Sequence, residues 1–73
     1  MQVVGRIIAV QEQRFRLLTD EGQVYLLTLA AAAGLEPSDL ARLQTEERQL
    51  TIQFDGEPNL KGGVARKVLL GSR

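Results

Sequence analysis

The sequence predicts a mainly β protein with one helix, folded as a five-stranded barrel. Five segments are rich in Val, Ile, Leu, Phe and Tyr, and most of them alternate apolar with polar residues, which is the period of a strand. One segment instead repeats leucine at the period of a helix, and it lies between the third and fourth strands. The predicted order is therefore β-β-β-α-β-β. The strand segments are residues 3–10, 14–19, 23–30, 50–54 and 64–70, and the helix is residues 37–47.

The first strand segment is apolar on both of its faces. Val4, Ile8 and Val10 fall on one face, and Val3 and Ile7 on the other. Such a strand is either buried on both sides or curled around a corner of a barrel. The glycine at position 5 supplies the bend that curling needs.

The second and third segments are predicted to form a hairpin. They are joined by the short acidic segment Asp20-Glu21-Gly22. Gly22 takes the left-handed position of a three-residue loop or the second position of a two-residue loop. The two loops differ by one residue in register, and a slip of one residue exchanges the two faces of the third strand.

The outer face of this hairpin depends on that register. Both alternatives place Arg14, Arg16 and Leu18 outside. The three-residue loop adds Thr28, Leu26 and Val24 to that face, whereas the two-residue loop adds Leu29, Leu27 and Tyr25. Either register leaves several large apolar side chains opposite the face of Phe15. A small monomer rarely exposes such a patch, so either residues 30–33 and the helix cover it or it is an interface.

The helix has clear signals at its beginning. Pro37 suits the first helical position, where a missing N–H has no consequence. Asp39 lies in the positive first turn. Leu35 and Leu40 flank the first turn as a hydrophobic staple, and Leu40 begins a narrow apolar stripe.

The glycine-rich segment 55–63 is predicted to be a loop, because it contains three Gly, one Pro and one Asn. Residues 64–70 then form the last strand. It is interrupted by Arg66 and Lys67, which as neighbours cannot share a face of a flat strand.

This order of elements resembles the OB-fold, a partly open Greek-key barrel. The features that match are Gly5 in a bent first strand, Gly22 at the first hairpin of the meander, the helix between strands three and four, and the glycine-rich connection of the last two strands. The segments 14–17, 54–60 and 62–65 are also similar to segments of small uncharacterised bacterial proteins. OB-fold proteins bind oligonucleotides, oligosaccharides, small ligands or other proteins, so the resemblance implies binding without choosing the ligand.

The composition excludes several classes of function. Nine basic and nine acidic residues give zero net charge, which excludes the broad basic field of a sequence-independent nucleic-acid coat protein. The chain has no Cys and no His, so it lacks a thiolate nucleophile, an imidazole base and the usual zinc ligands. We therefore expect a protein that is not an enzyme and uses no cofactor or metal.

The length predicts a single domain over residues 1–73, with residues 71–73 as a frayed tail. Dimerisation is an option for so small a domain without disulfides or metal. The longest apolar stretch, residues 24–33, is ten residues, against the about 20 that span a bilayer. The first six residues lack the basic-then-apolar order of a secretory signal, so we expect a cytoplasmic protein without membrane contact.

Two kinds of partner fit the exterior of the hairpin. The first is a protein, or a second copy of this chain, bound through an apolar patch that includes Leu18. The second is a single-stranded nucleic acid or an oligosaccharide, with the basic residues and Tyr25 as contacts. Phe15 is expected to point into the barrel, because Phe is usually buried. Neutral charge and few aromatic residues favour the protein partner. The candidate binding residues are Arg14, Arg16, Leu18, Tyr25, Lys61, Arg66 and Lys67.

Overall fold

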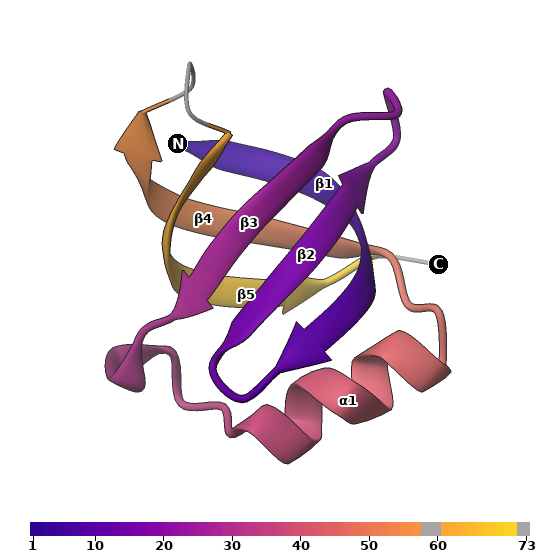
Figure 1. Cartoon of the computed structure of the whole chain (residues 1–73), viewed down its shortest axis with the longest axis vertical. Coiled ribbons are helices and arrows are strands. Elements are labelled where there is room, and N and C mark those ends of the chain that lie inside the picture. Colours follow the sequence, from indigo (N-terminus) through magenta and orange to yellow (C-terminus); the bar gives the residue numbers. More distant parts are fainter. Residues whose placement is uncertain (58–60, 72–73) are drawn as a thin grey trace.

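Five strands close into a barrel in the order β1-β2-β3-β5-β4 (Figure 1). The computed structural model describes residues 1–57 and 61–71. All neighbouring strands are antiparallel except β3 and β5, which are parallel. The mainly β fold class, the OB-like barrel and the order of elements predicted from the sequence are confirmed. The elements are β1 (Gln2–Gln11), β2 (Arg14–Thr19), β3 (Val24–Leu29), the short 3-10 helix η1 (Ala31–Ala33), α1 (Pro37–Thr45), β4 (Leu50–Glu57) and β5 (Gly62–Leu70).

Strand β1 bends from one neighbour to the next at Gly5. Residues 2–5 pair with β4, and residues 5–11 pair with β2, so Gly5 is paired on both sides. A Cβ at this position would lie only 2.8 Å from the carbonyl carbon of Leu18 and from the Cα of Thr19. Only glycine allows the two backbones to approach this closely, which explains why the bend is placed here.

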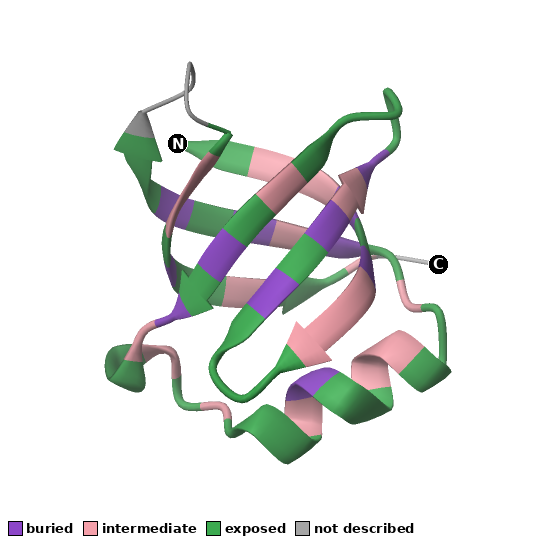
Figure 2. Ribbon diagram, viewed as in Figure 1, coloured by how far each residue is buried: buried purple, intermediate pink, exposed green. Residues whose placement is uncertain are grey.

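The β2–β3 hairpin has the register of the three-residue loop. Leu18 pairs with Val24 and Arg16 with Leu26, and Gly22 has a φ of 88°. At the end of the ladder, the backbone N–H of Gln23 donates to Oγ1 of buried Thr19, at 2.9 Å. Figure 2 shows the result as alternating buried and exposed bands along both strands. Phe15 points into the barrel, as predicted.

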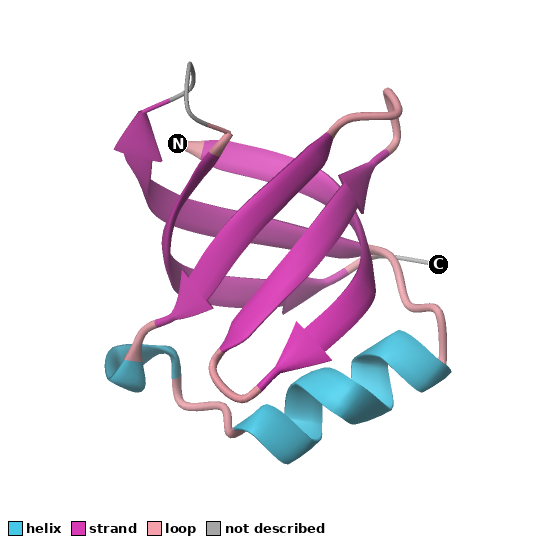
Figure 3. Ribbon diagram, viewed as in Figure 1, coloured by secondary structure: helices cyan, strands magenta, loops and turns pink. Residues whose placement is uncertain are grey.

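The core fills the barrel and continues to the helix. It combines inward side chains of all five strands with Leu40 of α1, and Leu35 and Leu43 pack against it from the same end. Figure 3 shows that α1 and η1 lie together at one end of the barrel. The side chain of Gln44 holds the helix to β1 by donating to the carbonyl of Ile8, at 2.9 Å. The helix therefore closes an end of the barrel and does not cover the outer face of the β2–β3 hairpin. The core residues are Ile7, Phe15, Leu17, Leu27, Leu29, Leu40, Leu50, Ile52, Phe54 and Ala65.

Helix α1 begins as predicted and ends earlier. Pro37 is its first residue, and Oδ2 of Asp39 accepts a hydrogen bond from the N–H of Glu36 at 2.8 Å. The prediction that it reaches residue 47 is wrong, because Glu47 takes a left-handed conformation with φ 53°. The N–H groups of Glu47 and Arg48 then donate to the carbonyls of Gln44 and Leu43, the pattern of a Schellman motif. Glycine usually occupies this position, so the sequence carried no signal for this end.

The predicted loop over residues 55–63 is largely paired strand, which corrects the sequence analysis. Strand β4 extends to Glu57 and β5 starts at Gly62, with Gly56 opposite Gly63. A Cβ on Gly56 would lie 2.9 Å from the Cα of Gly63. These glycines allow close pairing of two strands and do not mark a turn. Pro58, Asn59 and Leu60, part of the predicted loop, lie outside the described residues.

A β-bulge in β5 changes the expected exposure of Arg66 and Lys67. Gln53 pairs with Lys67 and Phe54 pairs with Ala65, so Arg66 is an extra residue in the ladder. Both basic side chains are exposed, although neighbours on a flat strand would point to opposite faces. The predicted frayed tail was residues 71–73. Within it, the N–H of Gly71 donates a hydrogen bond to the carbonyl of Gln49, at 2.7 Å. Residues 72 and 73 lie outside the described residues.

Candidate binding surface

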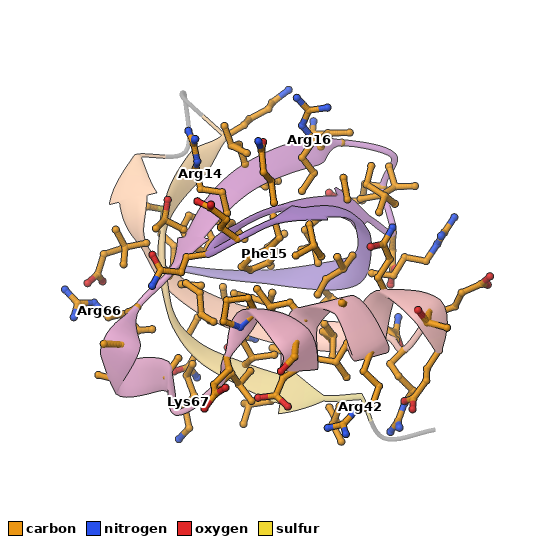
Figure 4. All side chains as sticks on the ribbon, turned by 60° about the horizontal axis from the view of Figure 1, so that its bottom comes forward. Arg14, Phe15, Arg16, Arg42, Arg66 and Lys67 are labelled. Carbon is orange, nitrogen blue, oxygen red and sulfur yellow. The ribbon has the colours of Figure 1, made fainter. Side chains whose placement is uncertain are left out.

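The outer face of β2 and β3 carries arginines, aliphatic side chains and one threonine. We call this surface the β2–β3 face. The register pairs Arg14 with Thr28, Arg16 with Leu26 and Leu18 with Val24, and each pair points away from the core. Figure 4 shows Arg14 and Arg16 on one side of the barrel, with Phe15 between them pointing into it.

Much of this face is apolar and in contact with water. Leu26 is 49% exposed and Val24 is 44% exposed, while Leu18 is half-buried. Val64 of β5 extends the apolar area by one strand, because it pairs with Thr28 and is 38% exposed. The patch therefore crosses three hydrogen-bonded strands. The sequence left cover by residues 30–33 and the helix as an alternative, but Val24, Leu26 and Val64 are exposed, and α1 and η1 lie at the end of the barrel.

The arginines of this side differ from the other described arginines in their partners. Arg42 forms an ion pair with Asp39 at 3.4 Å, Arg48 with Glu46 at 3.6 Å, and Arg66 with Asp55. Arg14 and Arg16 are exposed, and so is Arg6 of β1, which lies opposite Leu18. Within residues 1–57 and 61–71, none of these three arginines forms an ion pair with a described acidic side chain.

A shallow hollow of about 400 Å³ lies beside these arginines. Gln11 at the end of β1 lines one side, Arg14 and Arg16 line the middle, and Leu26 of β3 lines the other side. The hollow thus joins the cationic and the apolar parts of the β2–β3 face. Its walls are strand residues, so the backbone beneath it is held by the sheet.

The structure separates the predicted site residues into two groups. Arg14, Arg16 and Leu18 lie together on the β2–β3 face, as predicted. Lys61 is exposed at its border, where its carbonyl accepts a hydrogen bond from the N–H of Leu26 at 3.0 Å. Tyr25 is not part of the surface.

Tyr25 points to the inside because of the three-residue loop. Its ring packs edge-on against Phe54, with the centroids 5.7 Å apart and an interplanar angle of 68°. Arg66 is the bulge residue of β5 and Lys67 follows it; Arg66 is bound by Asp55, and Lys67 pairs with Gln53. Figure 4 places both away from Arg14 and Arg16.

Sequence reasoning missed two contributors to this surface, Arg6 and Val64. Arg6 comes next to Leu18 only through the pairing of β1 with β2, and Val64 comes next to Thr28 only through the parallel pairing of β5 with β3. Leu26 was assigned to the outer face in one of two registers. Gly22 suits the loops of both registers, so the sequence carried no signal that selected between them.

The described part of the chain shows neither a metal-ligating cluster nor a membrane-spanning helix. No group of three or more His, Cys, Asp or Glu side chains gathers within it to hold a metal ion. No described helix is long and apolar enough to cross a bilayer.

Comparison with known proteins identifies no protein related to this chain. No family model, curated protein or solved structure matches this chain. The similarity to small bacterial proteins stays a prediction from the sequence. The functional conclusion must therefore come from the surface itself.

Proposed function

We propose that this domain is a non-catalytic module that binds another protein through the β2–β3 face. The observation that carries the proposal is the exposed apolar patch formed by Val24, Leu26 and Val64 on the hydrogen-bonded strands β3 and β5. Contiguous exposed aliphatic side chains on a small protein mark interaction surfaces. A cytoplasmic location is part of the same proposal.

The energetics of this surface fit a protein interface. Covering the exposed half of a leucine such as Leu26 contributes about 1 kcal/mol. The sheet holds the patch in one geometry, so little conformational entropy is lost on binding. A standard interface covers about 800 Å² per partner. That area is about one sixth of this chain's 4782 Å² surface, so one side of the barrel provides it.

A single-stranded nucleic acid is a poorer match to this surface. Binding of single strands relies on bases stacked on exposed aromatic rings. The chain contains three aromatic residues, and none is exposed: Phe15 and Phe54 are buried, and Tyr25 is half-buried against Phe54. The arginines alone supply phosphate contacts without base stacking.

Capture of proteins from a lysate of the native host, with three forms of the domain, tests this function. Leu26→Glu places a charge in the centre of the patch, and Leu70→Glu makes the same change at an exposed leucine at the end of β5. We expect wild type and Leu70→Glu to retain the same proteins after nuclease treatment, and Leu26→Glu to lose them. Equal capture by all three forms, or loss of every captured protein on nuclease treatment, would contradict the proposal.

Sedimentation shows whether the bound protein is a second copy of the chain. If the face self-associates, Leu18→Glu shifts a wild-type dimer towards monomer, because Leu18 pairs with Val24 inside the patch. If wild type sediments as a monomer at all concentrations, the partner is a different protein.

A further inference from the structure

The charged residues of β1, β2 and β3 differ between the strands and the turns. The three strands contain three arginines and no acidic residue, whereas the turns that join them contain Glu12, Asp20 and Glu21. The segment 36–48, with α1 and its two ends, contains four acidic residues and two arginines. The charged side chains on the strands β1–β3 are therefore all cationic, and the acidic side chains nearby lie in the turns.

We propose that the β2–β3 face recognises an acidic and apolar segment of its partner, with carboxylates on Arg14 and Arg16 and apolar side chains on Leu26 and Val64. This inference rests on the proposed protein-binding function and adds the chemistry of the partner. It is carried by charge complementarity: Arg42, Arg48 and Arg66 are bound to carboxylates, whereas Arg14 and Arg16, like the neighbouring Arg6, form no ion pair with a described acidic side chain.

The spacing of the two arginines fits a peptide. They are two residues apart on one strand, so their Cα atoms are about 7 Å apart. Carboxylates at alternate positions of an extended segment, or one turn apart on a helix, have a similar spacing. Guanidinium groups bind carboxylates through paired hydrogen bonds, so each of the two arginines can hold one carboxylate of such a segment.

The hollow makes these contacts stronger than ordinary surface ion pairs. It is lined by both arginines and by Leu26, so a bound carboxylate lies beside an apolar side chain. A partner that also covers Leu26 and Val64 excludes water from the pair, and a lower local dielectric strengthens the attraction. A neutral apolar segment would cover the leucine but leave two guanidinium groups without partners.

The same observations argue against a second β2–β3 face as the occupant. Neither β2 nor β3 contains an acidic residue, so the strands of a second β2–β3 face would offer Arg14 and Arg16 no carboxylate. Nucleic acid would match the arginines but not the apolar patch across β3 and β5.

Fluorescence anisotropy with synthetic probes tests the inference. The probes are a labelled 12-residue peptide of three Glu-Glu-Leu-Ser repeats, its Gln-Gln-Leu-Ser counterpart, and a 12-nucleotide thymidine strand. We expect the Glu peptide to bind wild type at least tenfold more tightly than the Gln peptide does. Its affinity should also fall at least tenfold between 50 mM and 500 mM salt, because ion pairs are screened.

Two double variants with the same change in net charge locate the contact. Arg14→Glu with Arg16→Glu should abolish binding of the Glu peptide. Arg66→Glu with Lys67→Glu should leave its affinity within twofold, since both residues are exposed but lie away from the β2–β3 face. Thermal melts of both variants verify that they fold.

The outcomes separate this inference from the proposed function. One outcome is that the Glu and Gln peptides bind equally and only Leu26→Glu abolishes their binding. The face then binds peptides without selecting acidic ones, so the inference is wrong while the proposed protein-binding function stands. If no peptide binds wild type, or if both double variants lose binding equally, the inference is also overturned. If the thymidine strand binds more tightly than either peptide, both the inference and the proposed function fail.

Discussion

Replacing Gly5 with alanine is expected to lower the stability of the barrel by about 3 kcal/mol. The new Cβ would lie 2.8 Å from two backbone atoms of β2 and closer still to the carbonyl oxygen of Leu18. Ordinary contact begins near 3.4 Å, so β1 and β2 must separate by more than about 0.6 Å at a residue that is paired on both sides. Overpacking of this kind costs about 1–3 kcal/mol, and a weakened ladder hydrogen bond adds about 1 kcal/mol.

That loss is large for a chain of this size. A domain of 73 residues has a total stability of about 4–11 kcal/mol. Each kcal/mol lowers the Tm of such a domain by about 4–8 °C, so Gly5→Ala should lower it by roughly 10–25 °C. Circular dichroism during thermal and urea unfolding measures both quantities.

Gly22→Ala is the matched control for this experiment. Gly22 has a φ of 88° but no heavy atom within 4 Å of a built Cβ, so alanine there meets only the backbone penalty of about 1–2 kcal/mol. We expect Gly5→Ala to be clearly the more destabilising of the two. If Gly5→Ala is as stable as wild type, or more stable than Gly22→Ala, the close approach of β1 and β2 at this bend is wrong.

Three further substitutions test the local accounts by the same unfolding measurements. Glu47→Gly should raise stability by about 1 kcal/mol, because glycine adopts the left-handed conformation at the end of α1 without strain; a loss of stability would contradict the Schellman motif. Thr19→Val should cost about 1 kcal/mol, because it removes the acceptor of the Gln23 N–H, and an unchanged midpoint would show that this bond contributes nothing. Phe15→Ala should cost about 3–5 kcal/mol while Arg16→Ala changes stability by less than about 0.5 kcal/mol. If Phe15→Ala and Arg16→Ala lowered stability by similar amounts, the placement of Phe15 in the core and of Arg16 on the surface would be wrong.

The strands and the helix were predictable because their signals are local. The alternation through Arg14, Phe15 and Arg16 specifies which residues of β2 enter the core, whatever the partner strand is. Pro37 and Asp39 specify the start of α1 in the same way. The end of α1 was not predictable, because Glu47 occupies a position where glycine is the usual signal.

Features that depend on the pairing between strands could not be predicted from the sequence. Gly56 and Gly63 resemble loop residues until their strands are placed together, and only then does the close approach of their backbones explain them. The bulge at Arg66 likewise exists only relative to β4. For the same reason the binding surface was predicted in part. Arg14, Arg16 and Leu18 share one strand, whereas Arg6 and Val64 join them through neighbours.

Chemical-shift mapping of the ¹⁵N-labelled domain is the most direct test of the β2–β3 face as the binding surface. The domain is titrated with the Glu-Glu-Leu-Ser peptide, and the shifts of backbone amides are followed residue by residue. We predict that the largest changes fall on residues 14–18 of β2, residues 24–28 of β3 and Val64 of β5, with α1 unaffected. Changes concentrated on α1 or on residues 66–70, or a spectrum that does not change at all, would contradict the account.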